Sequence, residues 1–407
     1  MLDGVTVLDL ASVGPAARAS RWLADYGATV VKIGPVPAQA GVQIAPPFHA
    51  YSAHRGLKRV LVDLKAPDGR DAFLRLVDGA DVVIESFRPG VVDRLGIGYA
   101  SLRERNPRVV LCSTSGYGQD GPHAAWAGHD LNYLGVSGFL SCSTPAADGR
   151  PPIPGATIAD GAGGGMQAVL AILAALVRRS TTGEGAHLDV SAADGMLALM
   201  ALAIDDHLAT GAPQGPGLGL LTGRYACYGV YGTADGRWIT VAAIEHRFWA
   251  NLCRALGLDR WIDHQTDDAV QDQVRADLSL AFLARPRDEW VALLAPADTC
   301  VAAVLAVDEV ASDPQYLARG AFVTAKHPVH GSFRQVGALW AGALPVAPDQ
   351  EVSDALTTDT DALLAAAGLS DSEIGDARSL NDSSLTNTFM CRRSRPCSST
   401  IRNRMPG

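Results

Sequence analysis

The chain has 407 residues, of which 48% are hydrophobic and 19% are charged, and its formal net charge is −9 at pH 7. This length predicts two domains, and the composition is that of a soluble globular protein with a large core. The negative charge argues against nucleic acid as a partner, because a phosphate-binding surface needs concentrated positive charge.

The apolar runs and the cysteines further narrow the class of protein that the sequence fits. The richest apolar run, residues 166–177, is too short for a confident membrane span and fits a buried helix, so we expect no membrane partner. No basic region followed by an apolar one opens the chain, and we therefore expect no secretory signal and a cytoplasmic protein. The seven cysteines lack paired spacing, which argues against a disulfide framework and a zinc site. We expect no metal.

The first part of the chain alternates short β-rich runs with helical segments, which predicts an α/β domain with a mostly parallel, Rossmann-like sheet. The turn at residues 12–15 differs from the Gly-x-Gly-x-x-Gly fingerprint, so the interpretation of this domain as a dinucleotide-binding one lacks its motif. The predicted elements are strands at residues 5–10, 29–33, 60–63, 81–85 and 108–113, and a helix at residues 16–26 that Gly27 ends.

The middle of the chain begins with a long apolar helix at residues 164–179 and a strand at residues 187–190. Later, Asp235-Gly236 stands between two apolar runs and predicts a hairpin turn, with three helical segments after it. We predict four structured parts: the large domain at residues 1–212, a linker at 213–226, a smaller α+β domain at 227–322, and a return to the large domain at 323–368.

The last part of the chain, residues 369–407, is predicted to be a disordered tail that follows a closing helix at residues 358–368. Residues 381–407 are rich in Ser, Asn and Arg and have no apolar period, so they cannot bury enough surface to fold alone. Disorder and the product of a shifted reading frame both stay open for this segment.

Two short segments carry groups that can move a proton. His129 lies in Trp-Ala-Gly-His-Asp-Leu-Asn-Tyr-Leu at residues 126–134, and Asp160 precedes a glycine run and an apolar helix. An imidazole and a carboxylate suit chemistry that transfers a proton at carbon. Structural roles stay open for both: a buried, hydrogen-bonded histidine, and a helix N-cap aspartate. At a helix start, we expect the pKa of Asp160 to be lowered.

These segments occur together with residues 2–11, 24–33, 55–65 and 85–98 in an order that resembles the family III CoA-transferases of the CaiB/BaiF type. The resemblance covers residues 2–368. Transferases of this family commonly carry Phe or Tyr where this chain has His129, and Gly-His-Asp here is similar to the α-methylacyl-CoA racemases. The resemblance implies the family III fold and an interlocked homodimer, in which the small domain of one subunit closes the site of the other.

The resemblance also implies roles for the candidate catalytic residues. His129 and Asp160 would exchange the C2 proton of a 2-methyl-branched acyl-CoA on opposite faces, and Glu245 would pair with His129. The enolate formed on the way needs aimed donors, for which backbone N–H groups near residues 160–164 are candidates. Two alternatives stay open: a CoA-transferase with Asp160 as nucleophile, which forms a mixed anhydride, and a CoA-binding member without activity.

The resemblance implies no metal, flavin or nicotinamide and no separate cofactor, because CoA enters as the thioester substrate. Basic side chains give charge-assisted contacts to the CoA phosphates, although each is also an ordinary surface charge. The glycine run allows either close approach of a ligand or close helix packing. Arg224 and Tyr225 depart from the Gly-Gly-x-Pro-Tyr-Tyr pattern of the racemases, which leaves the acyl group open. The implied CoA contacts are Arg55, Lys58, Lys65, Arg88, Gly164 and Tyr228.

Overall fold

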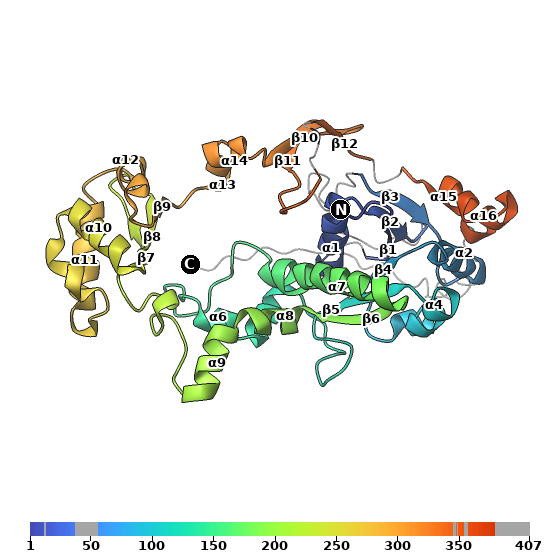
Figure 1. The fold of residues 1–407 in the computed structure, drawn as a ribbon, viewed down its shortest axis with the longest axis horizontal. Coiled ribbons are helices and arrows are strands. Elements are labelled where there is room, and N and C mark those ends of the chain that lie inside the picture. Colours follow the sequence, from blue (N-terminus) through green and yellow to red (C-terminus); the bar gives the residue numbers. More distant parts are fainter. Residues whose placement is uncertain (12–13, 37–55, 345–346, 348, 354–356, 379–407) are drawn as a thin grey trace, which may run out of the picture.

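The computed structural model describes residues 1–11, 14–36, 56–344, 347, 349–353 and 357–378. Within these residues, one sheet is formed by β1 (Thr6–Asp9), β2 (Thr29–Gly34), β3 (Lys58–Leu61), β4 (Val82–Glu85), β5 (Val110–Ser115) and β6 (Ala186–Ser191). Its strands follow the order β3-β2-β1-β4-β5-β6, and all its pairings are parallel (Figure 1). This is the strand order of doubly wound nucleotide-binding folds, and the predicted parallel α/β sheet is confirmed.

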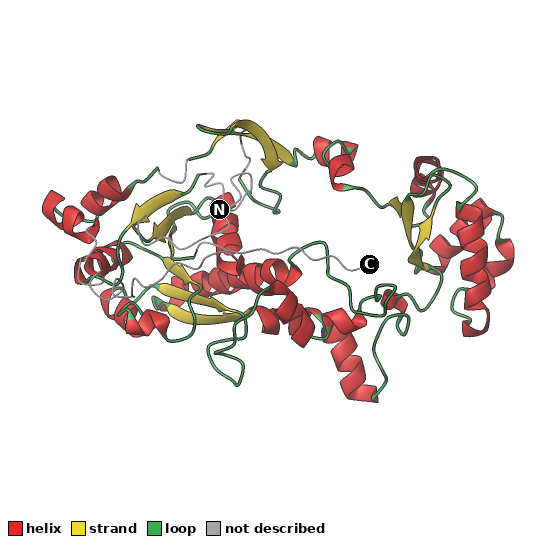
Figure 2. Ribbon diagram, turned by 180° about the vertical axis from the view of Figure 1, so that it is seen from behind, coloured by secondary structure: helices red, strands yellow, loops and turns green. Residues whose placement is uncertain are grey.

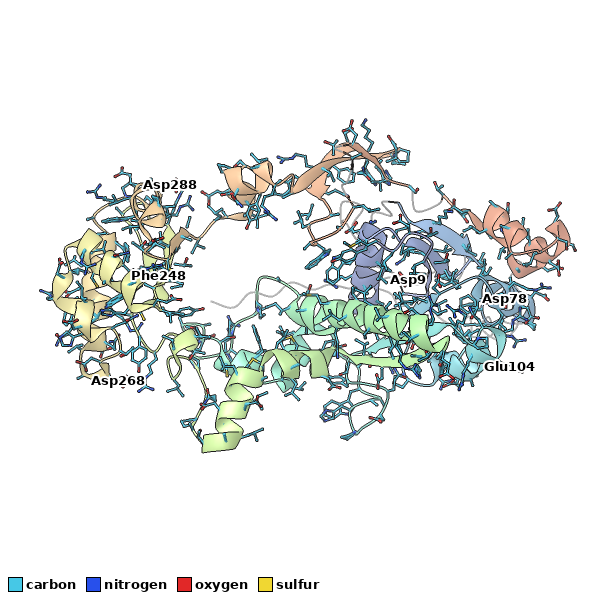
Figure 3. All side chains as sticks on the ribbon, viewed as in Figure 1. Asp9, Asp78, Glu104, Phe248, Asp268 and Asp288 are labelled. Atoms are coloured by element: carbon cyan, nitrogen blue, oxygen red, sulfur yellow. The ribbon has the colours of Figure 1, made fainter. Side chains whose placement is uncertain are left out.

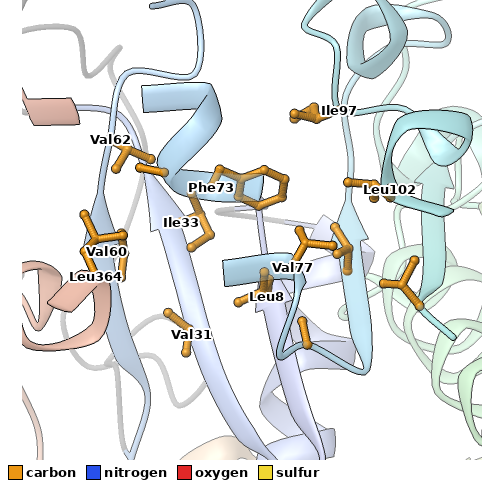
Figure 4. Packing of buried hydrophobic residues seen from close by; sticks show 14 of the residues in the cluster. Leu8, Val31, Ile33, Val60, Val62, Phe73, Val77, Ile97, Leu102 and Leu364 are labelled. Carbon is orange, nitrogen blue, oxygen red and sulfur yellow. The ribbon is translucent and has the colours of Figure 1, made fainter. Parts of the chain in front are cut away.

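Alternate residues of the four central strands, β2, β1, β4 and β5, enter two separate cores, because side chains of a strand point to opposite faces in turn. Leu8 packs with Val31 and Phe73 on one face, and Figure 4 shows this cluster at close range. Val7 and Val30 enter the second core. The first face is covered by α2 (Pro67–Val77) and α4 (Tyr99–Arg105), and the second by α1 (Gly14–Asp25) and α7 (Gln167–Thr182).

The apolar helix predicted at residues 164–179 is longer in the structure. A π-helix, η2 (Ala159–Met166), runs directly into α7. Together they form the segment Ala159–Thr182, which by length and composition alone is apolar enough to cross a membrane. In the structure this segment packs on α1, β5 and β6, as a core helix of the large sheet does.

The chain leaves the large sheet through α8 (Ala192–Leu199) and α9 (Ala201–Thr210) and enters a smaller unit. There, β7 (Tyr228–Gly232), β8 (Trp238–Ala242) and β9 (Val301–Ala303) form an antiparallel sheet. The hairpin predicted at Asp235-Gly236 joins β7 to β8. Its core gathers Trp249, Phe282 and their neighbours from α10 (His246–Leu256), α11 (Gln271–Phe282) and α12 (Arg287–Leu294).

Figures 1 and 2 show the smaller unit at one end of an elongated molecule, with the large sheet toward the other end. The chain returns through α13 (Val307–Val310) and α14 (Pro314–Ala318) to a third sheet of β10 (Phe322–His327), β11 (Gly331–Val336) and β12 (Asp349–Glu351). Trp340 then packs edge-on against Trp22 of α1, with ring centroids 4.8 Å apart. The limits that we set for the domains stay predictions.

The predicted tail begins too early. The closing helix is α15 (Thr360–Ala366), but a further helix, α16 (Asp371–Arg378), follows it. Ile374 and Ala377 lie three residues apart, so both face the core, where they are buried beside α2. This short apolar pair was overlooked because the rest of the segment is polar. Residues 379–407 lie outside the described residues.

Candidate active site

His129 is held by the start of the helix that follows it. It precedes α5 (Asp130–Val136), and its backbone N–H donates to the side-chain oxygen of Asn132 at 3.0 Å. Its carbonyl accepts the backbone N–H of Asn132 at 2.8 Å. The backbone is thereby fixed while the imidazole stays exposed, which leaves the ring available to a ligand.

Tyr133 also holds the segment that carries His129. Its hydroxyl donates to the carbonyl of Gly128 at 2.5 Å. A Cβ on Gly116 or Gly128 would fall 2.4 or 2.8 Å from the Tyr133 ring, so glycine is required at both positions for the ring to fit. Burial raises the pKa of Tyr133 to about 12, which keeps the hydroxyl a neutral donor at ordinary pH.

Asp160 lies in the first turn of η2 and is tied to the His129 segment. Its backbone N–H donates to Oδ1 of Asp130 at 2.9 Å, and its carboxylate lies 3.4 Å from the guanidinium of Arg18. Ile158, rather than Asp160, is the N-cap of η2. Because Asp130 follows His129 directly, this hydrogen bond joins the two candidate acid/base segments across thirty residues of sequence.

The expected lowering of the Asp160 pKa is wrong. Burial raises this pKa above its ordinary value, and the nearby charges of Arg18 and His129 oppose the rise without cancelling it. The side chain is only 19% exposed, so the loss of water outweighs the helix start that the expectation rested on.

The glycine run packs helices closely. A Cβ on Gly163 would fall 2.6 Å from the Ala192 carbonyl, and one on Gly164 would fall 2.6 Å from the Pro15 ring. Gly164 is buried, so its contact with CoA stays a prediction beside this observed packing role. Two N–H groups proposed as enolate donors are already used: those of Asp160 and Gly161 donate to Asp130 and to the Thr157 carbonyl.

A cavity of about 500 Å³ opens beside His129. It lies at the carboxyl ends of β4 and β5, where open α/β sheets bind their ligands. Arg88 and His129, which we proposed from separate motifs, line this same cavity. Its walls are Ser86, Phe87, Arg88, Pro89, Ser115, Gly116, Tyr117, Ala124, Trp126, Ala127, Gly128, His129, Asn132 and Tyr133.

The remaining candidates lie outside this wall. Lys58 and Lys65 are exposed at the start of β3 and just before α2. Glu245 precedes α10, and Tyr228 begins β7, both in the smaller unit (Figure 3, where Phe248 marks α10). Within the described part of one chain, no hydrogen bond or ion pair joins Glu245 to His129. Arg55 lies outside the described residues.

Three residues near the site were missed in the sequence. Arg18 and Asp130 contact Asp160, as given above. Glu85 is buried at the end of β4 and accepts the backbone N–H of Phe87, a cavity residue, at 2.7 Å. Glu85 is the last residue of an apolar strand, a position that signals a buried acid at the ligand edge of a sheet. No sequence signal marks the Arg18 contact.

The departure at Arg224 has a local explanation. Its guanidinium pairs with both carboxylate oxygens of Asp268, at 2.9 and 2.7 Å, on the surface of the smaller unit. The charge of Arg224 is therefore matched within the unit that carries it.

Comparisons with known proteins identify the family. The family model of CoA-transferase family III matches residues 2–350. The human protein named alpha-methylacyl-CoA racemase is 32% identical over 328 residues, which cover 80% of this chain and 83% of that protein. Succinate–glutarate CoA-transferase of Agrobacterium fabrum is 32% identical over 338 residues, covering 78% and 84%. A crystal structure of a CaiB/BaiF family protein from Brucella suis superimposes with a TM-score of 0.66 at 31% identity, covering 79% and 88%. The chain belongs to CoA-transferase family III.

Proposed function

We propose that this protein inverts C2 of 2-methyl-branched acyl-CoA thioesters by two-base proton transfer through an enolate. The observation that carries the proposal is the hydrogen bond from Asp160 N–H to Asp130, because it fixes the Asp160 loop to the residue next to His129. His129 lines the cavity, and the same hydrogen bond keeps the Asp160 segment next to the His129 segment. The family includes relatives with the required chemistry, such as the human racemase.

The proposed reaction uses the two groups in turn. One removes the C2 proton, and the electron pair of the C–H bond moves into the thioester as an enolate. The other returns a proton to the opposite face. Histidine suits this exchange because its pKa lies near neutral pH, and the raised pKa of Asp160 brings that carboxyl closer to the same range.

The acyl-CoA would enter along the cavity wall that carries Arg88, whose guanidinium suits a phosphate or pyrophosphate. Lys58 and Lys65, both exposed near β3, are further candidates for the phosphates. The thioester itself supplies CoA, and the proposed chemistry needs no other organic group.

We further propose that the active form is a homodimer. Helix α9 buries none of its residues within one chain, and its Leu202 and Leu208 are 72% and 76% exposed. Leu170 and Val177 of α7 are exposed as well. A second copy that covers these side chains would also bring a Glu245 from its smaller unit to His129.

The dimer can be tested by complementation. His129→Ala and Glu245→Gln each remove one member of a site that two subunits would share. If the subunits are mixed and allowed to exchange, each heterodimer regains one intact site, so activity returns in the mixture. Activity that stays absent in verified heterodimers would place Glu245 and His129 in the same subunit or in unrelated roles.

A CoA-transferase is the second candidate. The pairing of Asp160 with Arg18 favours it, because the nucleophile of that reaction is a carboxylate. The Agrobacterium relative with this activity is as similar as the human racemase.

One assay separates these candidates. A single stereoisomer of a 2-methylacyl-CoA is incubated with and without an added carboxylic acid, and both the stereochemistry and the CoA carrier are followed by chromatography. Loss of optical purity without added acid supports the racemase. CoA transfer that needs the acid, with stereochemistry kept, supports the transferase. CoA binding with neither change indicates a binding protein.

A further inference from the structure

Arg18 connects α1 to the segment that carries Asp160. Its guanidinium lies 3.4 Å from Oδ2 of Asp160 and donates to the hydroxyl of Thr157 at 2.6 Å. These contacts join residues that are 142 and 139 positions apart in the chain. The Arg18 side chain is only 13% exposed, so the interaction is weakly screened by solvent.

The glycine run makes this contact possible. A Cβ on Gly165 would fall 3.2 Å from the Cβ of Arg18, and one on Gly164 would meet Pro15 of the same helix. Glycine at both positions lets η2 lie directly on α1. The guanidinium then reaches the first turn of η2, where Asp160 lies.

We propose that Arg18 is a positioning residue that fixes the Asp160 carboxyl group and holds it in the ionised form for proton transfer. This inference rests on the proposed racemase function. In the step concerned, the C2–H bond breaks, the proton passes to the Asp160 carboxylate, and the electron pair stays on the substrate as the enolate. Protonated His129 then donates a proton to the opposite face of C2.

The charges around Asp160 set the direction of the effect. Arg18 faces it from α1, Asp130 and Tyr133 face it from α5, and His129 faces it from the residue before α5. Burial and Asp130 raise the pKa of Asp160, and the Arg18 cation opposes them. Loss of Arg18 therefore raises this pKa further, and less carboxylate is present at neutral pH.

The test compares Arg18→Gln, Arg18→Lys and Thr157→Val as full-length proteins. Deuterium incorporation at C2 is measured in D₂O against pH, separately for each stereoisomer of a 2-methylacyl-CoA. For the isomer whose proton passes to Asp160, Arg18→Gln is expected to lower kcat by about 10- to 100-fold. It is also expected to move the acid limb of the pH–rate profile to higher pH. Arg18→Lys keeps the charge, so its acid limb stays near that of the wild type.

Thr157→Val separates orientation from charge. It removes one anchor of the guanidinium and is expected to lower kcat with an unchanged acid limb. Arg103→Gln, on the exposed side of α4, is the matched control and should behave as the wild type. Unfolding temperatures show whether each variant is folded. If Arg18→Gln is not folded, Arg18→Lys still tests the inference.

Two failures are distinguishable. If the wild type exchanges C2 hydrogen and the acid limb of Arg18→Gln does not move, Arg18 does not act on Asp160 and the inference is overturned. If the wild type shows no exchange at any pH, the proposed racemase function is wrong, and the inference falls with it.

Discussion

Glu85 should make folding stability depend on pH. It ends β4 with 2% of its surface exposed and accepts the Phe87 N–H at 2.7 Å. Burial raises its pKa from 4.5 to about 7, although hydrogen bonds from Ser113 and Phe87 oppose the rise. The informative change is Glu85→Gln, which removes the charge and keeps an oxygen that can accept the Phe87 N–H.

The direction of the pH dependence of stability follows from the raised pKa of Glu85. The folded protein binds this proton more tightly than the unfolded chain does, so the stabilisation is complete below the unfolded pKa. It is lost as the pH rises from 4.5 through about 7. A rise from 4.5 to about 7 corresponds to about 3 kcal/mol of unfolding free energy. Above that range the contribution is constant.

Urea unfolding at about pH 5 and about pH 8 measures this difference. The wild type should lose about 2.5 kcal/mol more stability between the two pH values than Glu85→Gln does, because part of the full effect lies outside this pH interval. Glu104→Gln, on the exposed surface of α4, is the control and should keep the wild-type dependence. The same loss in the wild type and in Glu85→Gln would refute the reasoning.

Three further substitutions test the packing and a buried ion pair. Gly195→Ala would place a Cβ 1.9 Å from the Gly163 carbonyl, so we expect about 1–3 kcal/mol of destabilisation by thermal unfolding. Gly161→Ala meets no atom within 4 Å and should keep the wild-type midpoint; an equal loss in both variants would contradict the packing account. Glu309→Gln removes the carboxylate that the buried Arg287 binds at 2.9 and 2.6 Å, beside its contacts with Asp288 and the Val304 carbonyl, and should lower the unfolding midpoint. An unchanged midpoint would mean that Asp288 and the Val304 carbonyl suffice for Arg287.

Much of the large sheet could be predicted because its strands are short, apolar and separated by helical segments. The strand predicted at residues 29–33 is Thr29–Gly34 in the structure, and the helix predicted at residues 16–26 is Gly14–Asp25. Local sequence determines such elements. The helix α16 was missed because its burial depends on two apolar residues that find α2, far away in the chain.

The candidate site was predictable where a motif carries it. His129 and Arg88 were chosen from separate motifs, and both line the same cavity. The contact of Arg18 with Asp160 spans 142 residues and depends on how closely two helices pack, which no local pattern specifies. The predicted direction of the Asp160 pKa shift is wrong for the same reason: the burial that raises this pKa depends on the tertiary structure.

The most direct test of the proposed function is proton NMR of a 2-methylacyl-CoA incubated in D₂O with the wild type and with His129→Ala. Two-base inversion predicts deuterium at C2 with loss of optical purity in the wild type, and loss of the inversion in the variant. Absence of exchange in the wild type, together with transfer of CoA to an added carboxylic acid, would contradict the racemase and leave His129 a structural residue.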